Sequence, residues 1–109
     1  MSAITTHILD TAAGSPAAGI PVTLEMFAAV SRAWSVVGVS ITDGDGRASD
    51  LLPANHPMQE GVYRLRFDTS LRSTFFPEVS IQFNVADTRQ HYHVPLLLSP
   101  FGYSTYRGS

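Results

Sequence analysis

Two histidines at alternate positions, His91 and His93, are the residues of this sequence best suited to acid–base chemistry. Residues two apart in an extended strand point to the same side, so we expect both imidazoles on one face and Tyr92 and Val94 on the other. Because histidine titrates nearest neutral pH, a general acid–base site or a metal pair is one interpretation. A plain solvated face is the other. Spacing alone favours it, since a catalytic zinc needs about three protein ligands.

The sequence pattern does not decide the roles of several other polar residues. His7 lies in an expected first strand, where a single histidine indicates little by itself. Arg47 follows an Asp-Gly-Asp-Gly turn and is either a solvated loop cation or a clamp for an anion or carbonyl. That turn lacks the glutamate that completes a calcium loop, so we expect no calcium there. The chain keeps aromatic and polar side chains to its end, in Tyr106, Arg107, Gly108 and Ser109.

Short strands must position these residues, because runs rich in Val, Ile, Leu, Phe and Tyr are broken at regular intervals by Gly, Pro, Asp and Asn. The clearest run alternates apolar and polar residues from Val79 to Val85, which predicts a half-buried strand. No stretch keeps a helical period, and a single turn near 69–73 is the one place where a helix could fit. The pattern predicts an all-β sandwich or barrel with strands at 4–10, 22–26, 34–41, 63–67, 79–85, 91–98 and 103–107.

Length and composition exclude several classes of protein. The 109 residues, 44% of them apolar, suit one domain spanning 1–109. The seven Lys and Arg are scattered, so we expect no nucleic-acid partner. No run approaches the roughly 20 apolar residues of a membrane span, and with no signal segment we expect a soluble cytoplasmic protein. The absence of cysteine excludes disulfides and thiolate metal sites and fits a reducing compartment.

Nucleotide-type cofactors and serine nucleophiles also lack their motifs. The sequence has no dinucleotide fingerprint, no phosphate-cradling glycine loop and no Gly-Xaa-Ser-Xaa-Gly elbow. Composition and spacing therefore predict a β-sandwich, but they do not explain why His91 and His93 lie on one face of a strand.

Three motifs carry a resemblance to a known family. The first is His7-Ile8-Leu9-Asp10-Thr11 with Gly14-Ser15-Pro16-Ala17, the second is Asp43-Gly44-Asp45-Gly46-Arg47, and the third is the whole segment from His91 to Ser109. Together they resemble the transthyretin-related family over nearly the whole chain, from about residue 7 to residue 109. The terminal Tyr106-Arg107-Gly108-Ser109 is similar to the hydrolase branch, and the hormone carriers lack it. One departure is a short segment at 70–74, where the family usually carries a helix.

The resemblance implies a transthyretin-like antiparallel β-sandwich with a short or absent helix. It implies an enzyme that hydrolyses 5-hydroxyisourate to 2-oxo-4-hydroxy-4-carboxy-5-ureidoimidazoline in urate degradation, without metal or cofactor. The implied catalytic residues are His7, Arg47, His93 and Ser109, and the implied substrate-binding residues are Tyr106, Arg107 and Gly108. His91 lies outside this set and is expected to support it.

The same resemblance implies a homotetramer, built as a dimer of dimers, with active sites in clefts at the dimer–dimer interface. The expected partner is thus a small purine-derived substrate, with neither nucleic acid nor membrane. Two alternatives stay open. One is a non-catalytic carrier of the same fold that binds a small ligand between subunits, and the other is an immunoglobulin-like adhesion module.

Overall fold

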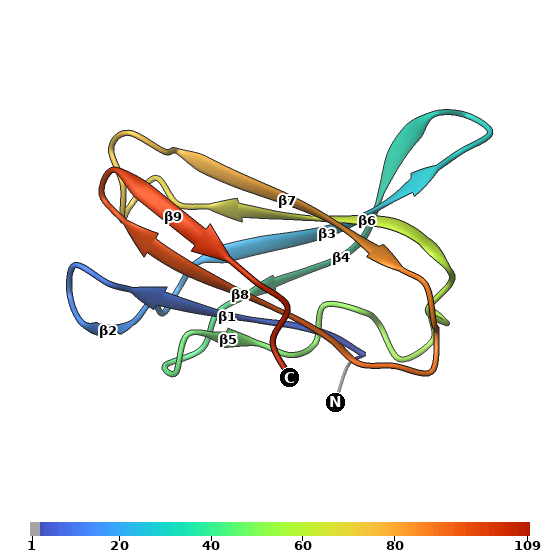
Figure 1. Cartoon of the computed structure of the whole chain (residues 1–109), viewed down its shortest axis with the longest axis horizontal. Helices are drawn as coiled ribbons and strands as arrows, with labels where there is room; N and C mark the ends of the chain where they lie inside the picture. The colour runs from blue at the N-terminus through green and yellow to red at the C-terminus, as the bar shows by residue number, and fades with distance from the viewer. Residues whose placement is uncertain (1–2) are drawn as a thin grey trace.

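Two β-sheets pack face to face in the computed structural model, which describes residues 3–109 (Figure 1). The structure is all-β, and no helix occurs among these residues, which confirms the expected fold class. None of the described residues forms a helix long and apolar enough to cross a membrane. The strands are β1 (Ile4–Asp10), β2 (Ser15–Pro16), β3 (Pro21–Ala28), β4 (Ala33–Ile41), β5 (Arg47–Ala48), β6 (Gly61–Asp68), β7 (Glu78–Val85), β8 (Tyr92–Ser99) and β9 (Gly102–Thr105).

One sheet has the order β2-β1-β8-β9, with the short β5 also paired to β1, and the other has the order β4-β3-β6-β7. Every pairing is antiparallel except that of β1 with β8, which is parallel. Strands from the two ends of the chain therefore lie side by side, as the blue β1 and the orange β8 do in Figure 1. This pairing brings the N-terminal and C-terminal motifs together.

The core lies between the two sheets and follows the alternation of the sequence. Inward-facing residues of β6 and β7, such as Leu65, Phe67 and Val79, are fully or almost fully buried and meet Ile8 and Leu96 of the other sheet. Burial of each such side chain stabilises the folded state by about 1.5–3 kcal/mol. The core therefore holds rigid the strands whose outer faces carry the polar residues.

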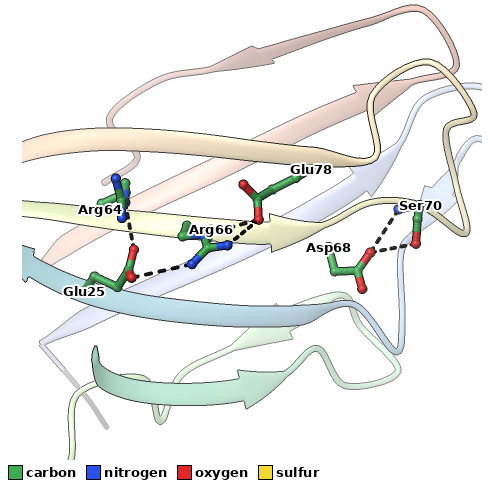
Figure 2. A network of polar contacts seen from close by, with 6 residues as sticks. All are labelled: Glu25, Arg64, Arg66, Asp68, Ser70 and Glu78. Atoms are coloured by element: carbon green, nitrogen blue, oxygen red, sulfur yellow. Dashed lines mark hydrogen bonds and ion pairs between the residues drawn. The ribbon is translucent and has the colours of Figure 1, made fainter. Parts of the chain in front are cut away.

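On the outer face of the second sheet, charged side chains form ion pairs with one another (Figure 2). Arg64 Nε donates to Glu25 Oε1 at 2.7 Å, and Arg66 lies between Glu25, at 3.6 Å, and Glu78, at 2.8 Å. The hydrogen bond from Arg64 is the main reason that the pKa of Glu25 lies below its ordinary value. Arg64 also covers the Trp34 ring at 4.1 Å. These cations are thus paired within the sheet.

The segment at 69–73 forms one turn and no more. The amides of Arg72 and Ser73 both donate to the Thr69 carbonyl at 2.9 Å, and Arg72 Nη1 reaches Asp10 Oδ2 at 3.1 Å. Before the turn, the Asp68 carboxylate accepts hydrogen bonds from Ser70 (Figure 2). The short sequence here leaves room for a single turn, as expected.

Two expected strands extended too far, while most of the others were too short by one or two residues. β8 begins at Tyr92 and not at His91, and β9 ends at Thr105 and not at Arg107. Beyond Thr105 the regular pairing stops, and the chain end pairs with β8 once more where the Gly108 amide donates to the His93 carbonyl at 2.8 Å, in an isolated antiparallel bridge that keeps the register of β8 with β9. The terminal segment therefore lies beside the histidine strand.

Candidate active site

The parallel pairing of β1 with β8 places Thr5 opposite His93. The Thr5 hydroxyl oxygen lies 2.8 Å from His93 Nδ1 and 2.8 Å from His91 Nε2. The two imidazole rings are 6.4 Å apart between centroids and nearly perpendicular. Both histidines thus point to the same side, as their alternate spacing predicted, while Tyr92 and Val94 are buried in the core.

Arg47 comes to the same face through the short strand β5, which places it opposite His7 on β1. The preceding turn is organised by Asp43, whose carboxylate accepts hydrogen bonds from the amides of Asp45 and Arg47 at 2.9 and 3.0 Å. Gly46 has a φ of 76°, and a Cβ there would lie 2.4 Å from the Ile8 carbonyl oxygen. The turn therefore requires glycine to bring Arg47 against β1.

His7 is held by the same turn. Its Nε2 lies 2.8 Å from the Asp45 carbonyl oxygen. A carbonyl oxygen only accepts, so Nε2 carries the proton and Nδ1 of the neutral ring keeps the free lone pair. The Asp43–Arg47 turn thus positions the first-strand histidine as well as the arginine.

The chain end packs directly on His93. A Cβ placed on Gly108 would lie 2.4 Å from His93 Cδ2 and 3.2 Å from Pro95 Cγ, so the backbone reaches the imidazole only because residue 108 is glycine. Together with the hydrogen bond from the Gly108 amide to the His93 carbonyl, this contact fixes where Ser109 lies.

These elements surround a cavity of about 250 Å³, which is lined by Thr5, Thr6, Arg47, Ser49, His91, His93 and Ser109. Three of the four residues expected to be catalytic, Arg47, His93 and Ser109, line it together. His7 is not among the lining residues, although it pairs with Arg47, which is one of them. Sequence reasoning missed Thr5 and Ser49. The alternation of a strand could have indicated both, because they are two residues from His7 and Arg47 respectively.

Tyr106 and Arg107 are placed elsewhere. The Arg107 guanidinium lies 4.6 Å above the Tyr92 ring, and its Nη2 donates to Gln90 Oε1 at 2.8 Å. Both residues line a second cavity of about 310 Å³ between β7 and the chain end. His93 contributes to both cavities. The structure therefore brings Gly108 to the histidine, and it does not bring Tyr106 or Arg107 into the first cavity.

Burial is the main reason that the pKa of His93 lies below its ordinary value, and the nearby charges of Arg47, His91 and His7 lower it further. A backbone hydrogen bond of Thr5 acts in the opposite direction. His93 is therefore neutral at pH 7 and can accept a proton there. Within residues 3–109, no cluster of three or more His, Cys, Asp or Glu side chains is arranged to hold a metal ion.

The arrangement suits addition of water to a carbonyl. A neutral imidazole can take a proton from water, and a guanidinium and hydroxyl groups on the same cavity can bind an anion or a developing oxyanion. The fold and this cavity define a small β-sandwich of the transthyretin type with a cavity lined by two histidines and an arginine on the outer face of one sheet. The sequence matches the model of the HIUase/Transthyretin family over residues 4–108, and the chain belongs to that family.

Two relatives show how similar the sequence is to named proteins. The chain is 43% identical to a 5-hydroxyisourate hydrolase of Salmonella dublin, over 97% of this chain and 80% of the relative. It is 46% identical to a bifunctional uric acid degradation protein of Arabidopsis thaliana over 97% of this chain, which spans only 37% of that larger protein. Both proteins carry names from the breakdown of urate.

Similar solved structures include a hydrolase and a transthyretin. The 5-hydroxyisourate hydrolase of Klebsiella pneumoniae matches with a TM-score of 0.82 and 33% identity, over the full length of both chains. Sea bream transthyretin, solved in complex with thyroxine, matches with a TM-score of 0.86 and 27% identity, over 96% of this chain and 93% of that one. The fold is thus common to both kinds of protein, while the sequence is more similar to the hydrolases.

Proposed function

We propose that this chain is a hydrolase that opens the ring of 5-hydroxyisourate, giving 2-oxo-4-hydroxy-4-carboxy-5-ureidoimidazoline in urate degradation. One observation carries the proposal: Arg47, His93 and Ser109 line one cavity, beside His7. Membership of a family with relatives named 5-hydroxyisourate hydrolases supports it. The substrate is a small purine-derived molecule, and its hydrolysis needs no cofactor.

His93 acts as the base. Its Nδ1 is engaged by Thr5, so Nε2 is the nitrogen that takes a proton from the attacking water. The proton later returns to the leaving ring nitrogen. His7 has Nε2 engaged by the Asp45 carbonyl and offers Nδ1 as the second titratable group of the acid–base pair.

Arg47 holds the substrate or its oxyanion. A guanidinium presents a planar fork of donors that matches a carbonyl or an anionic ring, and this charge also stabilises the tetrahedral intermediate. The Ser109 hydroxyl orients the substrate or the water. Gly108 packs against His93, and Gly108, Tyr106 and Arg107 contribute to substrate binding from the chain end.

The active species is a homotetramer built as a dimer of dimers, with the cavity closed by a second dimer. The support is that Arg47 and His91 are exposed in a single chain, so the cavity is open on the side away from the core. A second subunit over that face would exclude water and strengthen the electrostatic interactions within the site. The protein acts in the cytoplasm, a reducing compartment that suits a chain without cysteine.

The experiment that tests the proposal separates a hydrolase from a carrier. Freshly generated 5-hydroxyisourate is followed by its ultraviolet absorbance with and without the protein, and thyroxine binding is measured on the same preparation. Decay faster than the spontaneous rate, in proportion to protein concentration, supports hydrolysis. Thyroxine binding with an unchanged decay rate would assign the chain to the carriers and end the proposal.

A further inference from the structure

Thr5 makes a contact that the reaction as described does not use. Its hydroxyl oxygen lies 2.8 Å from a nitrogen of each of two histidines, His91 and His93, and its side chain belongs to a residue only 6% exposed. A hydroxyl has one proton to donate and two lone pairs. At most one of the two nitrogens can therefore accept from Thr5, and the other must be an N–H donor.

The proposed role of His93 sets the direction of these hydrogen bonds. Its Nδ1 faces Thr5, while Gly108 packs against the Cδ2 edge that adjoins Nε2. If Nε2 is to accept a proton from water, the neutral ring must carry its proton on Nδ1 and donate it to Thr5. The Thr5 hydroxyl proton is then directed to His91 Nε2, which accepts it. The resting chain of donors runs from His93 through Thr5 to His91.

We propose that Thr5 is a positioning residue that relays a proton between His93 and His91, so that His91 holds the proton during the reaction. This inference rests on the proposed function of His93 as the base. When His93 Nε2 takes a proton from water, the Nδ1–H bond breaks and that proton passes to Thr5 Oγ1. The Thr5 O–H bond breaks at the same time, and its proton passes to His91 Nε2. No proton is gained or lost.

The relay leaves His93 neutral with its proton on Nε2, ready to protonate the leaving ring nitrogen. As Nε2 gives up that proton, Nδ1 takes one back from Thr5, and Thr5 takes one from His91. Each histidine ends in its starting form. The same hydroxyl thus changes His93 from a base to an acid between the two steps, as hydrolysis requires.

The surroundings explain why the charge moves to His91. His93 is half-buried and faces Arg47 from β5, His7 from β1 and the chain end at Ser109, so two potential cations disfavour a second positive charge. His91 precedes β8, is exposed, and can be hydrated. A positive charge costs less there than on His93, because water solvates the exposed imidazolium.

Kinetics of matched variants test the relay. Thr5→Val removes the hydroxyl and keeps the branched shape, Thr5→Ser keeps the hydroxyl, and Thr11→Val is the control. Thr11 also joins β1 to β8, donating to the Leu98 carbonyl at 3.1 Å, but it is far along the sheet from the histidines. We expect Thr5→Val to lower kcat roughly tenfold or more with KM nearly unchanged, and Thr5→Ser to restore most of it. Thr11→Val should keep normal turnover.

The pH profile distinguishes a relay from packing. Without Thr5 as acceptor the His93 imidazolium loses a hydrogen bond, so its pKa falls and the acidic limb of kcat/KM moves to lower pH in Thr5→Val. His91→Gln should lower kcat by a similar factor, and the double variant should lose no more than either single variant. An unchanged acidic limb in Thr5→Val, equal losses in Thr5→Ser and Thr5→Val, or fully additive losses with His91→Gln would each overturn the relay.

Nitrogen NMR of the imidazoles tests the bridge without any substrate. Above the pKa of His93, the wild-type protein should show His93 with its proton on Nδ1 alone, and Thr5→Val should show a mixture of both tautomers. A His93 spectrum that Thr5→Val leaves unchanged refutes the bridge. If the wild-type protein fails to hydrolyse 5-hydroxyisourate, the proposed function fails, and this spectrum still decides the bridge separately.

Discussion

Replacing Gly108 with alanine should separate activity from folding more sharply than any other single change. The added Cβ would lie 2.4 Å from His93 Cδ2 and 3.2 Å from Pro95 Cγ. Carbon atoms in contact are about 3.5–4.0 Å apart, so something must move by about 1 Å. His93 is held by its strand and by Thr5, whereas Gly108 is one residue from the chain end. The tail is therefore the part that moves.

The expected magnitudes follow from that difference. Keeping the tail in place would cost about 1–3 kcal/mol of overpacking. Releasing it costs mainly the hydrogen bond from the Gly108 amide to the His93 carbonyl, about 0.5–1.5 kcal/mol. We expect a Tm loss below about 12 °C, because about 1 kcal/mol corresponds to 4–8 °C in a chain of this size. A displacement of about 1 Å at the site can lower kcat/KM roughly hundredfold.

The assay compares kcat/KM for 5-hydroxyisourate with the thermal midpoint of the same preparations. Gly102→Ala is the matched control, because a Cβ there meets only Ser99 Oγ at 3.5 Å, an ordinary contact. The control should keep both activity and stability. If Gly108→Ala hydrolysed the substrate within about threefold of the wild-type rate, the packing of the tail on His93 would have no part in catalysis.

Four further predictions concern single positions. His93→Asn should abolish hydrolysis in a folded protein because no titratable group replaces the imidazole, and measurable turnover near the wild-type rate would remove His93 from the mechanism. Arg47→Lys should lower kcat/KM roughly tenfold or more because a point charge cannot donate in a fork, and an unchanged value would make Arg47 a loop cation. A tag added after Ser109 should inactivate the enzyme while an N-terminal tag does not, and equal activities would place the chain end outside the site. Glu25→Gln should reduce the loss of Tm on acidification from about pH 6 to about pH 3. The reason is that a carboxylate with a lowered pKa stabilises the fold above its ordinary pKa and loses that contribution as pH falls. An equal loss of Tm in both proteins would show that the ion pairs of Glu25 with Arg64 and Arg66 contribute nothing.

Much of the fold could be predicted because its strands carry their own signal. The alternation of Val79 to Val85 requires one buried face, and β7 has that face against the core. The two-residue strands β2 and β5 were not predicted, because two residues show no periodicity and pair only where β1 already lies. The strand end expected at Arg107 was also misplaced, because regular pairing stops before Pro95, which has no amide hydrogen to donate, and resumes only at the single bridge between His93 and Gly108. The strand expected from His91 begins one residue later.

The site was predictable in its parts but not in its connections. The alternate spacing of His91 and His93 predicted that they share one side, and the resemblance of the terminal motif to the hydrolase branch predicted a catalytic role for Ser109. The sequence of neither strand predicts that β1 pairs in parallel with β8, and this pairing places Thr5 between the histidines. The position of Arg107 over the Tyr92 ring likewise depends on the pairing of the chain end with β8 beyond Thr105.

The central claim is that this cavity hydrolyses 5-hydroxyisourate, and identification of the product tests it most directly. Carbon NMR spectra of labelled 5-hydroxyisourate, recorded over time with and without the protein at neutral pH, follow substrate and product separately. We expect 2-oxo-4-hydroxy-4-carboxy-5-ureidoimidazoline to appear faster with the wild-type protein and at the spontaneous rate with folded His93→Asn. Identical time courses with and without the wild-type protein would contradict it.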